Sequence, residues 1–196
     1  MASVLATPVS VPVPATPVYD VPPLAQHRQF IVPPLSFQLV ATGVYRSGYP
    51  LPINFPMLER LGLKTIIYLG DPTYLPENTA WCAAHHITLH HFLQPAVKEP
   101  FLHQNPDIIA AALHILLDRR NYPVLVHSNK GKHRAGVLVG CMRRVLQGWS
   151  LAATHAEYDR YAGEKGEADL EFIELFNPHL EYERAFSPPW LRGAEA

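Results

Sequence analysis

The chain has 196 residues, a formal net charge of −1 and only two cysteines, Cys82 and Cys141. Because the charge is nearly balanced, no global field draws the protein to nucleic acid or to an anionic membrane, and neither is expected as a partner. Two cysteines are too few for a disulfide framework. The sequence has no secretory signal and no run of about 18 apolar residues that would predict a transmembrane helix, so we predict a cytoplasmic protein.

The first 34 residues differ in composition from the rest of the chain. Eight prolines fall there, at positions 8, 12, 14, 17, 22, 23, 33 and 34. Proline removes a backbone donor and fixes φ, so this segment is unsuited to a helix or a central strand. We predict a Pro-rich disordered tail over residues 1–34, which is either a plain extension or a binding segment for a partner module. One folded domain is predicted over residues 35–196.

From Ser36 onward, apolar runs typical of strands alternate with helical spacing. The strands are predicted at 37–45 (one or two strands), 64–69, 87–92 and 122–127, with a turn at 46–48. The helices are predicted at 56–61, 76–85, 106–118, 134–147, 150–161 and 167–176. Strands that alternate with helices predict an α/β fold, with a central, mostly parallel sheet flanked by helices.

The stretch from Val124 to Gly136 contains a short apolar strand, a polar loop and the start of a helix. Such a loop can point several backbone N–H groups at one anion, and the helix N-terminus adds partial positive charge. Gly131 permits a left-handed turn, and the forked side chain of Arg134 can hold two phosphate oxygens. Further donors are Lys130, Lys132 and His133.

The alternative for this loop is a solvated basic turn that caps a helix. Basic side chains at a helix N-terminus oppose the helix dipole, which disfavours that alternative. The spacing of a Walker loop, Gly-x4-Gly-Lys-Ser/Thr, is absent. We therefore predict a phosphate-binding loop at residues 127–134.

The loop reads His127-Ser128, five residues, then Arg134, and it resembles the His-Cys-x5-Arg signature of cysteine-dependent phosphatases. The string from Asn129 to Arg134 resembles the plant and fungal atypical dual-specificity phosphatases. Other matching segments are Val44–Gly48, Asn54–Pro56, Leu61–Ile66, Lys98–Phe101 and Glu157–Tyr161. The sequence Pro188-Pro189-Trp190-Leu191 is similar to the fungal branch named for oxidant-induced cell-cycle arrest.

This resemblance implies a dual-specificity phosphatase-like fold and hydrolysis through a phosphocysteine at position 128. It also implies that the loop residues bind the phosphoryl group while His127 supports the loop. The implied phosphate-binding residues are Asn129, Lys130, Gly131, Lys132, His133, Arg134 and Ala135. The implied ligand is a phosphorylated small molecule, such as an inositol pyrophosphate, or a phosphotyrosine in a phosphoprotein.

Ser128 departs from the pattern at the nucleophile position. A serine hydroxyl stays protonated in a positive loop and needs a positioned base to attack phosphorus. His127 precedes it on a strand, so its side chain should point to the other face and is a poor base. Ala135 is a second departure, because many members of the family carry threonine or serine there. Either the cysteine was replaced to trap substrate, or the chain is a natural pseudophosphatase.

In this fold, the general acid comes from a loop ahead of the phosphate loop. Glu99 is the first candidate, Asp71 the second and Asp107 the third, and the alternative for each is a surface or capping carboxylate. Arg46, after the first strand, is either a substrate contact or a structural ion-pair partner.

Two functions remain open at this point. The first is an enzyme that hydrolyses phosphate esters or diphosphates. The second is a pseudophosphatase that binds phosphate as a scaffold or regulatory subunit in a stress-response complex, in a hetero-oligomer with related family members. No cofactor and no metal are expected, since His85 and His86 end a helix while His90 and His91 face opposite ways on a strand.

Overall fold

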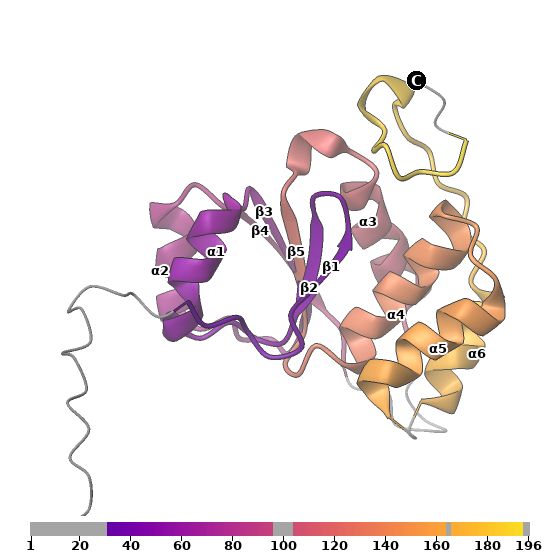
Figure 1. The fold of residues 1–196 in the computed structure, drawn as a ribbon, viewed down its shortest axis with the longest axis horizontal. Coiled ribbons are helices and arrows are strands. Elements are labelled where there is room, and N and C mark those ends of the chain that lie inside the picture. Colours follow the sequence, from indigo (N-terminus) through magenta and orange to yellow (C-terminus); the bar gives the residue numbers. More distant parts are fainter. Residues whose placement is uncertain (1–30, 96–103, 164–165, 194–196) are drawn as a thin grey trace, which may run out of the picture. The chain divides into compact units, whose positions relative to one another are not determined.

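A computed structural model describes residues 31–95, 104–163 and 166–193. Its centre is a five-stranded sheet of order β1-β2-β5-β3-β4 (Figure 1). The strands are β1 (Gln38–Ala41), β2 (Val44–Ser47), β3 (Thr65–Gly70), β4 (Thr88–Leu93) and β5 (Val124–His127). β1 runs antiparallel to β2, whereas β2, β5, β3 and β4 pair in parallel. The predicted α/β fold with a mostly parallel sheet is therefore confirmed.

Two groups of helices cover the two faces of the sheet (Figure 1). The helices are α1 (Phe55–Leu61), α2 (Pro76–Ala84), α3 (Pro106–Leu116), α4 (His133–Cys141), α5 (Leu151–Ala162) and α6 (Glu167–Leu175). α1 and α2 pack on one face in an apolar cluster that includes Leu58, Trp81 and Leu125. The other four helices lie on the opposite face, where the larger core includes Val126 and Ile173. Both Cys82 and Cys141 are free thiols buried in these cores.

The strand that precedes the site, β5, lies at the middle of the sheet because it pairs with β2 on one side and β3 on the other. All of its residues are buried, as are all six of β3. Residues buried on both faces of a parallel sheet read as continuous apolar runs, which explains the β-branched pattern of these segments. The site therefore follows a strand that is central in the sheet and completely buried.

Two local expectations are corrected by the structure. The turn predicted at 46–48 begins only at Gly48, because Arg46 and Ser47 pair with β5 as the last residues of β2. The helix predicted at 134–147 is α4 only to Cys141, and a π-helical turn from Met142 to Leu146 follows it.

The end of the predicted tail contacts the folded domain. The Val32 carbonyl accepts a hydrogen bond of 3.1 Å from Asn54 Nδ2, and the Pro34 carbonyl accepts one of 3.2 Å from Phe37 N. Residues 1–30 lie outside the described part of the chain, so the prediction of disorder remains a prediction. The backbone from residue 31 thus leads directly into β1.

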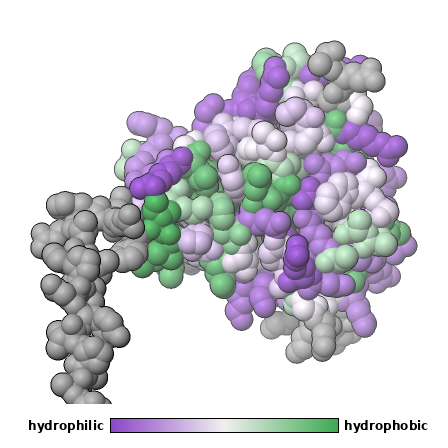
Figure 2. Space-filling view, viewed as in Figure 1, coloured by the Kyte–Doolittle hydropathy of each residue, from purple (hydrophilic) through white to green (hydrophobic). Residues whose placement is uncertain are grey.

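The visible face of the molecule is mixed in character (Figure 2). Hydrophilic side chains dominate over the end formed by α4, α5 and α6, and apolar patches lie toward α1 and α2. Leu35 and Leu39 are among the large apolar residues that remain exposed, at 65% and 54%. Among the described residues, no helix has the length and apolar character needed to cross a membrane.

Candidate phosphate-binding site

The loop between β5 and α4 is held against the segment that leaves β2. The Ser128 amide donates to the Ser47 carbonyl at 3.4 Å, and the Tyr49 amide donates to the Asn129 carbonyl at 3.1 Å. Ser36 Oγ adds a third link, a 3.1 Å hydrogen bond to the Lys130 carbonyl. Ser128 itself is buried at the base of the loop. These bonds turn some loop carbonyls away from the site, which leaves loop N–H groups for an anion.

Gly131 is required at the tip of the loop. Its φ is +70°, in the left-handed region where a side chain is strained. A Cβ at this position would lie 2.5 Å from the Gly48 nitrogen and 2.5 Å from the Ser47 carbonyl carbon. The loop therefore approaches the backbone after β2 more closely than any residue with a side chain would allow.

Arg46 braces the loop from behind. Its side chain is buried, and Nη2 donates to the Gly131 carbonyl at 2.8 Å and to the Lys132 carbonyl at 3.4 Å. The guanidinium also lies 3.8 Å from the centre of the Tyr161 ring. Among the described residues no carboxylate bonds Arg46, and the side chain is 1% exposed, so these contacts match neither the ion pair nor the substrate contact considered from the sequence.

Arg134 lies at the other end of the loop, in the first turn of α4. Its Nη1 donates to the Gln94 carbonyl at 2.9 Å and lies 3.4 Å from Asp71 Oδ1. The side chain is 12% exposed, so its position is largely fixed by the protein. Within the described part of the chain, both contacts use Nη1, which leaves Nε and Nη2 to a ligand.

Asp71, which directly follows β3, meets the loop at its rim. Its carboxylate accepts a hydrogen bond from Asn129 Nδ2, and Tyr68 OH donates to Asn129 Oδ1 at 2.8 Å. The hydrogen bond from Asn129, together with the charge of Arg134, holds the pKa of the Asp71 carboxyl below its usual range. A carboxyl with a lowered pKa stays ionised, which favours a role in orienting Asn129 and Arg134 over a role as proton donor.

The other two acid candidates lie elsewhere. Glu99 falls outside the described residues. Asp107 lies in the first turn of α3, where its amide donates to the capping side chain of Asn105 at 2.9 Å. A carboxylate in the first turn of a helix suits the helix dipole, so the capping alternative accounts for Asp107.

His127 lies beneath Ser128 in a cluster of aromatic rings. Its Nε2 lies 3.1 Å from Tyr74 OH, and its ring stacks on Tyr68 with centroids 4.7 Å apart. Tyr49 meets the same imidazole edge-on at 5.2 Å. Nε2 is thus engaged by a tyrosine, and within the described residues no imidazole or carboxylate hydrogen-bonds the Ser128 hydroxyl. The serine has no positioned base in this part of the chain.

Burial lowers the pKa of His127 to about 3. An unfolded histidine titrates near 6.5, so between these two values the unfolded chain binds a proton that the folded chain does not. We expect His127 to make the free energy of unfolding fall as the pH drops from about 6.5 toward 3, by up to about 1.4 kcal/mol per pH unit. Urea denaturation from pH 7 to pH 4 would show a shallower slope in His127→Asn. Equal slopes in the two proteins would contradict the prediction.

Three donors predicted from the sequence have solvent-exposed side chains. Lys130, Lys132 and His133 are exposed, whereas Ala135 is completely buried within α4. The structure thus places cationic and neutral donors around one loop, above a buried serine. Ala135 has only its backbone to offer a ligand.

Sequence reasoning missed several polar groups behind the loop. Gln94 and Gln104 are buried, and Gln94 Nε2 donates to Gln104 Oε1 at 2.8 Å. Gln104 Nε2 donates in turn to the buried carboxylate of Asp169 at 2.8 Å. Asp169 also accepts from Tyr158 OH, which lies 2.9 Å from His133 Nδ1. Asp169 alone carried a signal, as a polar residue on a helix face that also bears apolar residues, whereas Gln94 and Gln104 lie outside the helices and gave none.

The histidine cluster weighed from the sequence is divided between separate contacts. His85 lies 3.3 Å from Glu59, whereas His91 bonds the Asp71 carbonyl at 2.7 Å. Among the described residues, no three potential ligands are grouped as a metal ion would require.

A mostly parallel sheet whose central strand leads through an arginine-ended anion loop into a helix defines a phosphatase-type α/β domain. The chain belongs to the tyrosine phosphatase family. The sequence profile of this family matches residues 31–192, which is almost all of the domain.

Individual relatives agree with this assignment. Inositol diphosphatase DSP4 of Arabidopsis thaliana is 42% identical over 150 residues, which cover 76% of this chain and 75% of that protein. Tyrosine-protein phosphatase-like protein OCA2 of Saccharomyces cerevisiae is 43% identical over 163 residues, covering 80% and 81%. The core catalytic domain of the PP-IP phosphatase SIW14 from S. cerevisiae, solved with citrate, superposes with a TM-score of 0.70 at 37% identity, over 76% of this chain and 89% of that one.

Proposed function

We propose that the loop from Ser128 to Arg134 binds an inositol pyrophosphate, and that Ser128 keeps hydrolysis absent or nearly so. The observation that carries the proposal is that Arg134, which uses only Nη1 for its contacts within the described residues, and the exposed side chains of Lys130, Lys132 and His133 all belong to the one short segment between β5 and the first turn of α4. In a near-neutral chain, this local concentration of donors favours a ligand with several negative charges.

The rim of the loop supports a polyphosphorylated ligand over a lone phosphotyrosine. Within the loop, the side chains of Lys130 and Lys132 are exposed to solvent. They are therefore suited to bind phosphates that neighbour the phosphate held by Arg134. The relative named inositol diphosphatase and the SIW14 structure with citrate, itself a small polyanion, support the same class of ligand. Phosphotyrosine in a phosphoprotein remains the alternative ligand.

Turnover in this family requires a nucleophile at position 128. A thiolate there would attack phosphorus while the loop N–H groups and Arg134 hold the phosphoryl oxygens in the transition state. Serine stays protonated, and the nearest histidine, His127, is engaged with Tyr74. The loop donors do not depend on the nucleophile, so ligand binding persists without hydrolysis.

A second function is supported by the same observation, that no base hydrogen-bonds Ser128 within the described residues. In this alternative the chain is a pseudophosphatase, a regulatory or scaffold subunit that senses the phosphorylated ligand and assembles with related family members. The relative named phosphatase-like supports this alternative. Purification of tagged protein from its own host tests it, because co-purifying family members are expected and a lone monomer would contradict the assembly.

The binding proposal predicts a large effect at Lys132. In Lys132→Glu, an attractive charge becomes a repulsive one at the rim, so affinity for diphosphoinositol pentakisphosphate should fall about tenfold or more by calorimetry. Lys64→Glu, the same charge change at an exposed position before β3, is the matched control and should lower affinity less than about threefold because exposed distant charges are screened. Equal losses in both variants would mean that the ligand responds only to net charge.

A further inference from the structure

A buried carboxylate stands behind the loop at the junction of two hydrogen-bond chains. Asp169 on α6 is 4% exposed, and its two oxygens accept from different partners. Oδ1 accepts from Gln104, and Oδ2 accepts from Tyr158. Within the described residues, no lysine or arginine pairs with it, and a buried carboxylate needs such hydrogen bonds in place of water. No part of the loop chemistry described above uses this group.

The first chain fixes a proton on His133. The Tyr158 hydroxyl has one hydrogen, and it is donated to Asp169, so this oxygen must accept from His133 Nδ1 at 2.9 Å. Burial, with the hydrogen bond to Asp169, raises the pKa of the Tyr158 hydroxyl, which keeps that hydrogen in place. His133 Nδ1 also lies 3.4 Å from Asp169 Oδ2. The proton of the imidazole therefore lies on Nδ1, and Nε2 is the nitrogen left for a ligand or solvent.

The second hydrogen-bond chain fixes the backbone carbonyl that accepts a hydrogen bond from Arg134. Asp169 accepts from Gln104, and Gln104 accepts from the side chain of Gln94, with both distances 2.8 Å. The backbone carbonyl of Gln94 then accepts from Arg134 Nη1 at 2.9 Å. The three links join α6, the segment that precedes α3 and the residue that follows β4 to the arginine of the loop. All three relay side chains are buried, so water does not compete for these bonds.

We propose that Asp169 is a positioning residue of the anion loop. Through Tyr158 it holds the proton of His133 on Nδ1, and through the two glutamines it fixes the carbonyl that orients Arg134. The consequence for ligand binding rests on the proposed function, whereas the position of the proton does not.

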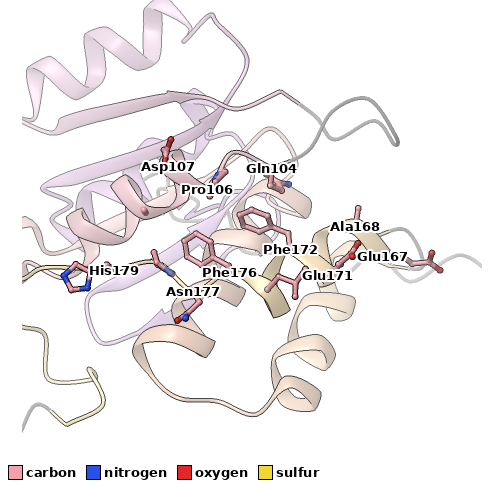
Figure 3. Close-up of a pocket in the computed structure, with 13 residues that line it drawn as sticks. Gln104, Pro106, Asp107, Glu167, Ala168, Glu171, Phe172, Phe176, Asn177 and His179 are labelled. Carbon is pink, nitrogen blue, oxygen red and sulfur yellow. The ribbon is translucent and has the colours of Figure 1, made fainter.

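The neighbouring groove supplies a matched control. Gln104 lines a groove of about 1100 Å³ between α3 and α6, which Phe172 and Glu171 also line (Figure 3). Glu171 is exposed and is on the same helix as Asp169, two residues away. The variant Glu171→Gln therefore removes one negative charge from α6 and leaves the buried hydrogen-bond chains of Asp169 intact.

The first test is nitrogen NMR of the imidazole in the full chain without ligand. The expected result is a proton on Nδ1 of His133, with or without a second proton on Nε2. A neutral His133 that carries its proton on Nε2 alone would overturn the proposal. This measurement needs no variant and no ligand, so it is decisive even if the protein binds no inositol pyrophosphate.

The second test compares Asp169→Asn with Glu171→Gln. In Asp169→Asn, the new side-chain amide offers hydrogens to Tyr158, so the hydroxyl turns toward His133 and the proton moves to Nε2. Affinity for diphosphoinositol pentakisphosphate should fall about tenfold, although removing a negative charge near a polyanion site would by simple electrostatics raise it. Glu171→Gln should change affinity less than about twofold. A folded Asp169→Asn that binds as tightly as the parent, or more tightly, would overturn the proposal.

A further variant covers the case in which Asp169→Asn does not fold. Tyr158→Phe removes a single hydroxyl and keeps the ring that packs in the core. The His133 proton then loses its acceptor at 2.9 Å and keeps only the 3.4 Å contact with Asp169. An affinity loss of about threefold to tenfold, with a changed nitrogen spectrum of His133, is expected. An unchanged spectrum together with unchanged affinity would overturn the role of this chain.

Discussion

Ser128→Cys is expected to turn a silent protein into a phosphatase. Phosphate release from diphosphoinositol pentakisphosphate should rise at least about 10²-fold over the parent, since loss of a nucleophile alone costs an enzyme factors of that size or larger. The physical reason is the loop itself, because a positive anion site lowers a thiol pKa from about 8.5 toward roughly 3.5–7.5 and yields a thiolate at neutral pH. The parent serine stays protonated in the same field.

The control for this experiment is the double variant Ser128→Cys with Arg134→Ala. The thiolate would remain, but the fork that holds the phosphoryl oxygens in the transition state would be lost, so activity should fall back about 10²-fold or more. Activity equal to that of Ser128→Cys alone would point to a contaminating enzyme or a different site. Silence of Ser128→Cys while the ligand still binds would favour the pseudophosphatase over a site that lacks only its nucleophile.

The fold could be predicted well because its strands carry strong local signals. The strand predicted at 64–69 contains the β-branched run Thr65 to Ile67, which indicates an interior strand, and β3 covers nearly the same residues and is buried throughout. The end of β2 was missed for a different reason. Arg46 and Ser47 are polar, and only their pairing with β5, far along the chain, keeps them in the sheet.

The loop of the site could also be located from the sequence, since its residues are consecutive. The residues of other elements that contact the loop could not be located in this way. Gln104 and Asp169 are 65 positions apart, and the bond between them follows from the packing of α6 beside the start of α3. A single polar residue on an apolar helix face predicts burial of a polar group but not its partner. Tyr68 gave no signal, because an aromatic residue in a buried strand ordinarily belongs to the core.

Gly131→Ala is expected to damage both stability and binding. A left-handed φ costs a residue with a side chain about 1–2 kcal/mol, and overpacking adds roughly 1–3 kcal/mol. The new Cβ would meet backbone atoms of Ser47 and Gly48 at 2.5 Å, and backbone in a sheet cannot yield as a flexible side chain can. We therefore expect a loss of about 2–4 kcal/mol in the free energy of unfolding, measured by urea denaturation.

The binding effect follows from the same clash, because relief requires the loop to move away from β2. The Gly131 carbonyl would then leave Arg46 Nη2, and the loop N–H groups would no longer converge, so ligand affinity should fall at least about tenfold. Gly62→Ala is the control. Gly62 has a similar φ of +61°, but no atom lies within 4 Å of a Cβ built there. The free energy of unfolding of Gly62→Ala should therefore fall by only about 1 kcal/mol, and its ligand affinity should not change. Equal destabilisation of the two variants would show that the close approach behind the loop contributes nothing, and that strain alone explains the glycine.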